Sequence, residues 1–129
     1  MLFNHSAEQS VIGALLQDEL SHLSELSVND FDKPEHKDIF EAISNLHANK
    51  DTVDVQTVSN ELARRSINHS AYMIKCCRNV PTTANAGAYV RIVLECSRRR
   101  AMYQALMTGA DRISNGMNDV DEVLDGVKS

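Results

Sequence analysis

Three consecutive arginines, Arg98, Arg99 and Arg100, are the residues whose type and spacing most directly suggest chemistry. Arginine binds phosphate through paired hydrogen bonds, so the run is a candidate nucleic-acid contact. The surrounding segment, VPTTANAGAYVRIVLECSRRRAMYQAL, is predicted to be helical, and three successive helical residues spread over about 200° of the circumference. They form no single basic stripe. Ion pairs within the chain or with a second subunit are therefore favoured, with nucleic-acid contact and plain solvation as alternatives.

The charge of the whole chain also argues against binding of DNA by bulk electrostatics. The 129 residues carry a formal net charge of -5. Residues 85–116 hold 5 basic and 2 acidic side chains, and the segments on both sides are acidic. Because phosphate contacts by Lys and Arg supply most non-specific affinity for DNA, we expect little direct DNA binding.

No residue pattern in the chain predicts catalysis or cofactor binding. A phosphate-binding loop needs closely spaced glycines followed by lysine, whereas these glycines are scattered: Gly13, Gly87, Gly109, Gly116 and Gly126. The five histidines form no HExxH motif, and the cysteines form no CxxC pair. His36 and His47 are expected at the edge of a buried helical stripe. We therefore expect no metal, no cofactor and no enzymatic activity in this chain.

The cysteines and the apolar runs indicate the compartment. An odd number of cysteines, Cys76, Cys77 and Cys96, does not suggest a disulfide framework, and the adjacent pair is predicted to be small core residues. No apolar run approaches the roughly 20 residues that span a bilayer, and the N-terminus does not resemble a signal peptide. The sequence predicts a cytoplasmic protein without a membrane partner.

The elements that position these residues are predicted to be helices throughout. Start signals are a Ser6–Gln9 capping box, Pro34 in a first turn and Asp54 as an N-cap. Further helices are expected over residues 18–27 and 70–78. Apolar residues recur at helical spacing, and no run alternates with period two. The sequence thus predicts an all-α fold, with residues 1–96 forming a compact head of about five helices.

A sixth helix, from about Asn85 to Asn115, is predicted to extend beyond that head. It contains no proline, and Gly116 stands where a helix-ending glycine belongs. At 1.5 Å per residue such a helix is about 45 Å long, too long to lie entirely on the head. A short amphipathic helix follows Gly116. Residues 97–129 are therefore predicted to form a protruding helical hairpin.

An apolar stripe on this hairpin predicts an oligomer interface. A lone two-helix hairpin cannot cover the stripe by itself, and each large apolar side chain gains about 1.5–3 kcal/mol when it is fully buried. A second copy of the hairpin is the simplest cover. The predicted interface residues are Met102, Leu106, Ala110, Ile113, Met117, Val120, Val123 and Leu124.

Several segments resemble, in order and spacing, the N-terminal domain of DnaB-type replicative DNA helicases. The first is Ala7–Leu16, AEQSVIGALL, and the second is Asp30-Phe31 with Pro34, His36, Ile39 and Phe40. The others are Val53-Asp54 with Thr57-Val58, and Val80-Pro81 with Ala84-Asn85, Tyr89 and Ile92-Val93. Residues 66–70, SINHS, depart from the family, and beyond Glu95 the resemblance is one of pattern only.

The resemblance implies a role in DNA replication. Domains of this family pair through their hairpins and form a trimer-of-dimers collar on a hexameric motor. The implied partners are a second copy of the chain, primase and possibly a helicase loader. The family's ATPase, with its ATP and Mg²⁺, is a separate domain. Two alternatives stay open: a collar domain of a longer helicase, or a free-standing protein that binds or inhibits a cellular helicase.

Overall fold

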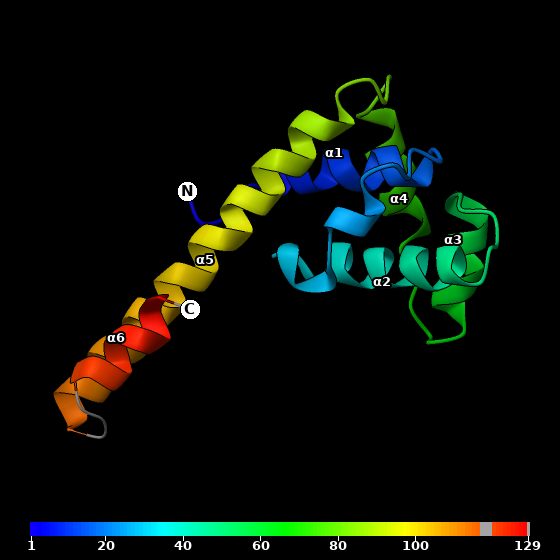
Figure 1. Cartoon of the computed structure of the whole chain (residues 1–129). Coiled ribbons are helices and arrows are strands. Elements are labelled where there is room, and N and C mark those ends of the chain that lie inside the picture. The colour runs from blue at the N-terminus through cyan, green and yellow to red at the C-terminus, as the bar shows by residue number, and fades with distance from the viewer. Residues whose placement is uncertain (117–119, 129) are drawn as a thin grey trace.

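The computed structural model describes residues 1–116 and 120–128, whose regular structure consists of helices. Four helices belong to a head: α1 (His5–Leu16), α2 (Pro34–Ala48), α3 (Val55–Ala63) and α4 (Ser70–Arg78). The long α5 (Ala86–Asn115) leaves the head as a rod, and α6 (Val120–Lys128) runs back beside its far half (Figure 1). The predicted all-α head with a protruding hairpin is confirmed.

The central helix of the head is α1, which contacts α2, α4 and α5. Its residues Val11, Ile12, Leu15 and Leu16 are buried. The helix begins two residues earlier than the predicted capping box, because the Asn4 side chain accepts a hydrogen bond from the Ala7 amide at 3.0 Å. The prediction of Ser6 as N-cap was therefore wrong.

The helix predicted over residues 18–27 is replaced by two 3₁₀ turns, η1 (Leu23–Glu25) and η2 (Val28–Asp30). Asp18 takes a left-handed conformation with φ 69°, which ends α1 and redirects the chain. Leu20, Leu23 and Leu26 recur every third residue, a spacing that fits one side of a 3₁₀ helix as well as one side of an α-helix. All three leucines contact the core, as predicted. The prediction of an α-helix in this segment was wrong.

The starts of α2 and α3 follow the predicted local rules. Pro34 occupies the first turn of α2, where a missing amide donor costs nothing. The Asp54 carboxylate accepts a hydrogen bond from the Thr57 amide at 2.8 Å and caps α3. The side chains of these helices meet α1 and α4 in one core, whose largest fully buried members are Phe31, Ile12, Ile39, Ile43, Leu62 and Met73.

The rod consists of 30 residues, and its buried positions lie mostly in its first third. Ala86, Val90, Val93 and Cys96 pack on the head, and Gly109 is the buried residue described further along. The head boundary predicted at residue 96 falls inside α5, which continues through it without a break. Gly116 ends the rod in the left-handed conformation, with φ 65°, as its position in the sequence predicted.

Candidate interaction surface of the helical hairpin

One face of the rod carries large apolar side chains that the chain itself leaves half exposed. Met102, Leu106 and Ile113 are 49%, 52% and 53% exposed, and Ala110 is also exposed. Tyr103 and Met107 are exposed beside them, although the spacings of three and four residues that define the predicted stripe do not include them. With 100° per residue, the six positions span about 140° of the helix surface. We call this set of six residues the apolar face of α5.

The second hairpin helix covers a neighbouring face of the rod instead. Val123 and Val127 lie against Gly109, where a Cβ would stand 3.0 Å from the nearer Val123 methyl. The closeness of the two helices thus depends on the missing side chain at residue 109. Val123 is consequently 4% exposed, because its own chain already buries it. The predicted role of Val123 in an interface with a second chain stays a prediction.

The beginning of α6 adds apolar surface near the free end of the hairpin. Val120 and Leu124, both predicted as interface residues, are exposed. Acidic residues lie among them in the same helix, which opens with Asp121 and Glu122. Met117, also predicted at the interface, lies outside the described residues. The prediction that these residues contact a second chain remains a prediction.

The three arginines have different surroundings. Arg98 and Arg99 lie 3.3 and 3.2 Å from the Glu95 carboxylate, one turn earlier on the same helix. Arg100 instead donates to the backbone carbonyls of Leu2 and Asp30, each at 2.8 Å. Arg100 therefore holds the N-terminal segment and η2 against the rod, so its partners lie within the chain. The predicted contact with a second subunit or nucleic acid still applies to the exposed Arg98 and Arg99.

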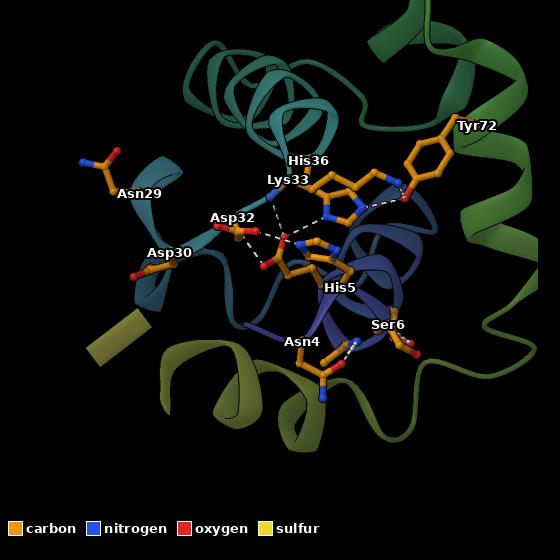
Figure 2. A network of polar contacts seen from close by, with 12 residues as sticks. Asn4, His5, Ser6, Asn29, Asp30, Asp32, Lys33, His36 and Tyr72 are labelled. Atoms are coloured by element: carbon orange, nitrogen blue, oxygen red, sulfur yellow. Dashed lines mark hydrogen bonds and ion pairs between the residues drawn. The ribbon is translucent and has the colours of Figure 1, made fainter. Parts of the chain in front are cut away.

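A buried polar network connects three helices of the head. The Glu8 carboxylate on α1 accepts hydrogen bonds from the Asp32 and Lys33 amides, at 2.9 and 3.3 Å, and lies 2.8 Å from His36 Nδ1 on α2. His36 Nε2 lies 2.6 Å from the Tyr72 hydroxyl on α4. Figure 2 shows His36 beside Tyr72, with a dashed line for their contact. His36 is fully buried, so the prediction that it lies at the edge of the core was wrong, whereas His47 is exposed.

The electrostatics of this network keep Glu8 ionised. Burial raises the pKa of Glu8, but the hydrogen bonds from His36 and from the two backbone amides outweigh it, so that the pKa lies below its ordinary 4.5. A carboxylate can only accept, so His36 Nδ1 carries a proton. Burial also raises the pKa of Tyr72, which keeps its hydroxyl protonated. The network therefore connects α1, α2 and α4 through hydrogen bonds.

The head also buries a cysteine thiol, that of Cys76. Burial raises the pKa of the Cys76 thiol to about 11, so at neutral pH it is not a nucleophilic thiolate. Across residues 1–116 and 120–128, no three His, Cys, Asp or Glu residues are grouped to hold a metal ion.

In the same part of the chain, no helix has the length and apolarity needed to span a membrane.

Comparison with known proteins gives one consistent match. A model of the DnaB-like helicase N-terminal domain matches residues 1–95. The replicative DNA helicase DnaB of Mycobacterium leprae is 36% identical over 107 residues, which are 78% of this chain and 18% of that protein. The replicative DNA helicase DnaC of Bacillus subtilis is 33% identical over 95% of this chain and 28% of its own length. The chain thus spans less than a third of these relatives.

Two solved structures resemble the whole chain. The N-terminal domain of DnaB helicase from Mycobacterium tuberculosis has a TM-score of 0.90 and 30% identity, covering 98% of this chain and 97% of that one. The structure of a DnaB-like replicative helicase and its interactions with primase has a TM-score of 0.82 and 18% identity. It covers 97% of this chain and 31% of that one. At this lower identity the likeness concerns the fold alone.

Proposed function

The chain belongs to the family of DnaB-like helicase N-terminal domains, and from this premise we propose that it is the oligomerisation and partner-docking domain of a replicative DNA helicase. The observation that carries the proposal is the apolar face of α5, which lies beyond the head and which α6 leaves uncovered. The proposed role of the chain in DNA replication is to hold the helicase subunits together and not to catalyse a reaction.

Pairing of two hairpins is the step that this surface supports. Burying the exposed half of Met102, Leu106 or Ile113 stabilises a complex by about 1 kcal/mol for each side chain. The same residues contribute from both copies in a symmetric dimer, so the gain doubles. Tyr103 and Met107 enlarge the contact further. Dimers of this kind are the building block of the proposed trimer-of-dimers collar in a hexamer.

The catalytic part of the proposed helicase lies outside this chain. The matched curated relatives extend far beyond the aligned region, since this chain covers 18% and 28% of their lengths. We assign ATP hydrolysis, with its ATP and Mg²⁺, to that separate region. The chain supplies no cofactor-binding residues in this proposal, and the protein as a whole is an ATP-dependent DNA helicase.

Docking of primase, and of a helicase loader in some replication systems, is the second part of the proposed role. It is supported by membership of the family and by the relative whose structure includes its interactions with primase. The firmly packed head suits this task, because the Glu8, His36 and Tyr72 network fixes three helices relative to one another. A rigid surface binds a partner without the cost of ordering it first.

The pairing is tested by placing a charge on the apolar face of α5. Leu106→Asp and Ile113→Asp each put a carboxylate where a second hairpin would bury it, at a cost of several kcal/mol. Sedimentation velocity at micromolar concentration is expected to show a dimer or a larger species for the unmodified chain and a monomer for both variants. Circular dichroism should show unchanged helicity, because both positions are exposed in the single chain.

A matched control comes from the head. Ile74 on α4 is exposed to a similar degree but lies far from the hairpin, so Ile74→Asp should leave the association unchanged. A monomer at every concentration for the unmodified chain would refute the proposed pairing. Continued dimerisation of both hairpin variants would place the interface elsewhere.

A further inference from the structure

The rod is attached to the head through two contacts of different chemistry. The first is apolar and lies where α5 packs on α1, with Val90, Val93 and Cys96 of α5 buried. The second is polar and lies further along α5, where Ser97 and Arg100 contact η2 and the N-terminal segment. Both contacts lie within the first half of α5, and the second half projects beyond them (Figure 1).

The polar contact connects three segments that are far apart in the sequence. Ser97 Oγ donates to the Asp30 carboxylate at 2.7 Å. The Arg100 guanidinium donates to the Leu2 carbonyl at 2.8 Å through one nitrogen, and to the Asp30 and Asn29 carbonyls at 2.8 and 3.4 Å through another. Arginine holds several donors in one rigid plane, which allows it to bind both segments at once. We call Ser97, Arg100 and these acceptors the clip.

The corner between the head and the rod is open beyond the clip. A pocket of about 380 Å³ lies there, lined by Asp32 and Lys37 from the head and by Ala101 and Gln104 from the rod. Ala101 and Gln104 are exposed, although they follow Arg100 and Ser97 on the same side of α5. Solvent therefore reaches this side of the rod directly after the clip.

Apolar packing by itself specifies the direction of a helix loosely. Crossing angles of packed helices scatter by about 15–20° around their preferred values. Hydrogen bonds, in contrast, weaken steeply when their distance or angle changes. Because Arg100 donates both to the N-terminal segment and to η2, turning α5 over α1 would lengthen at least one of these bonds. The clip therefore restrains an angle that the apolar contact leaves loose.

We propose that the clip sets the direction of the rod relative to the head. From Cys96 to Asn115 the helix rises about 28 Å, so a rotation of about 20° displaces its far end by about 10 Å. Ser97 and Arg100 are thus positioning residues: they determine where the head holds the outer half of α5. An open clip leaves the core of the head intact, because its hydrogen bonds are replaced by bonds to water.

The role of the clip is separate from the proposed pairing of hairpins. With 100° per residue, Ser97 and Arg100 point about 180° and 120° away from Leu106 on the apolar face of α5. Substitutions in the clip therefore leave that face unchanged. They alter the angle at which each chain presents it.

The angle is measured as a distance between two nitroxide labels by double electron–electron resonance. Asn45→Cys on α2 and Ser114→Cys near the end of α5 place the labels at exposed positions. Cys77→Ser removes the half-buried native thiol, and Cys76 and Cys96 are buried. Mass spectrometry of the chain without the two introduced cysteines checks that it takes up no label. Dilution with a large excess of unlabelled chain restricts the signal to distances within one chain.

The unmodified clip should give one narrow distance distribution. Combining Ser97→Ala with Arg100→Ala should shift its mean by about 5 Å or more, or at least double its width. Arg100→Lys keeps the charge but not the planar set of donors, so it should act like Arg100→Ala. Arg99→Ala is the matched control, since Arg99 lies beside Glu95 on the same helix and should leave the distribution unchanged.

The opposite result has a clear meaning. If the combined variant stays helical by circular dichroism and keeps the narrow distribution at the same mean, apolar packing alone sets the direction and the clip does not. Should the combined variant fail to fold, the single variants Arg100→Ala and Arg100→Lys decide the question in the same way. Sedimentation velocity keeps this result apart from the proposed function: clip variants should still associate, and Leu106→Asp should leave the distance within one chain unchanged.

Discussion

At the scale of single residues, Glu8 shows how a buried charge is stabilised in a small head. Its side chain is 1% exposed, yet it is held ionised by two backbone amides and by His36. The amides belong to Asp32 and Lys33, just before α2, so the carboxylate also lies near the positive end of that helix. Loss of this one charge therefore affects the attachment of α2 to α1.

Replacing Glu8 by Gln is expected to destabilise the head by about 2 kcal/mol at pH 7. The amide is similar in size, but its NH₂ group would face donors, and the charge that strengthens these hydrogen bonds would be lost. Urea unfolding followed by circular dichroism measures the difference. Glu41→Gln is the matched control, since Glu41 forms an exposed pair with Arg65 that should contribute less than about 1 kcal/mol.

The pH dependence of that difference has a definite sign. The folded pKa of Glu8 lies below its ordinary 4.5, so its ionised form contributes stability above that value. This stability is lost as the pH falls through the folded pKa. The gap between the unmodified chain and Glu8→Gln should therefore be full at pH 7 and smaller at pH 4. An equal gap at both would mean that the charge of Glu8 is not what stabilises the head.

The sequence contains a signal for the burial of Glu8 and His36. Glu8 precedes the buried Val11 and Ile12 by three and four residues, and His36 precedes Ile39 and Phe40 by the same intervals. Each polar residue thus lies on the buried side of its own helix. What the sequence does not contain is the pairing, because Glu8 and His36 meet only when α1 and α2 are packed together.

At the scale of elements, the approach of α1 to α4 depends on Gly13. A Cβ at this position would stand 2.4 Å from the Cys76 carbonyl oxygen and 2.9 Å from a Val80 methyl. The first of these atoms belongs to the backbone of α4, which cannot rotate away. The absence of a side chain at residue 13 therefore sets the distance between the two helices.

Gly13→Ala is expected to destabilise the head by about 2 kcal/mol or more, because the helices must separate to admit one methyl group. Gly126→Ala is the matched control: nothing lies within 4 Å of a Cβ there, and alanine favours a helix over glycine by up to about 1 kcal/mol. Urea unfolding of both variants provides the measurement. Equal changes in the free energy of unfolding for both variants would show that helix propensity, and not the close approach of α1 to α4, determines the effect of Gly13→Ala.

The elements were predictable where a local rule determines them. Pro34, Asp54 and Gly116 mark helix ends through their own backbone or side-chain chemistry, and each was read correctly. The segment after α1 was misread, because Leu20, Leu23 and Leu26 fit both a 3₁₀ and an α-helical side. Asp18 resolves this ambiguity through its left-handed conformation, which only the folded chain shows.

At the scale of the whole molecule, the length of α5 separates two kinds of surface. The helix α5 continues beyond the head as a rod (Figure 1). The rod carries the apolar face, whose large side chains are exposed. The spacing of Met102, Leu106 and Ile113 in the sequence predicted an apolar stripe on the rod. In the structure all three side chains are exposed. The side of α5 that α6 covers could not be predicted from the sequence, because it depends on the three-dimensional contact between Val123 and Gly109.

The charge of the whole molecule predicts weak binding of DNA. The net charge of -5 repels a polyanion, and the exposed Arg98 and Arg99 already lie beside Glu95. Fluorescence anisotropy with single-stranded DNA at physiological salt should therefore give a dissociation constant weaker than about 100 µM. Arg98→Ala and Arg99→Ala should change it little, because two separated charges release few counterions. Tight binding that both substitutions abolish would instead make the arginine run a nucleic-acid contact, and the hairpin would then bind DNA as well as a second subunit.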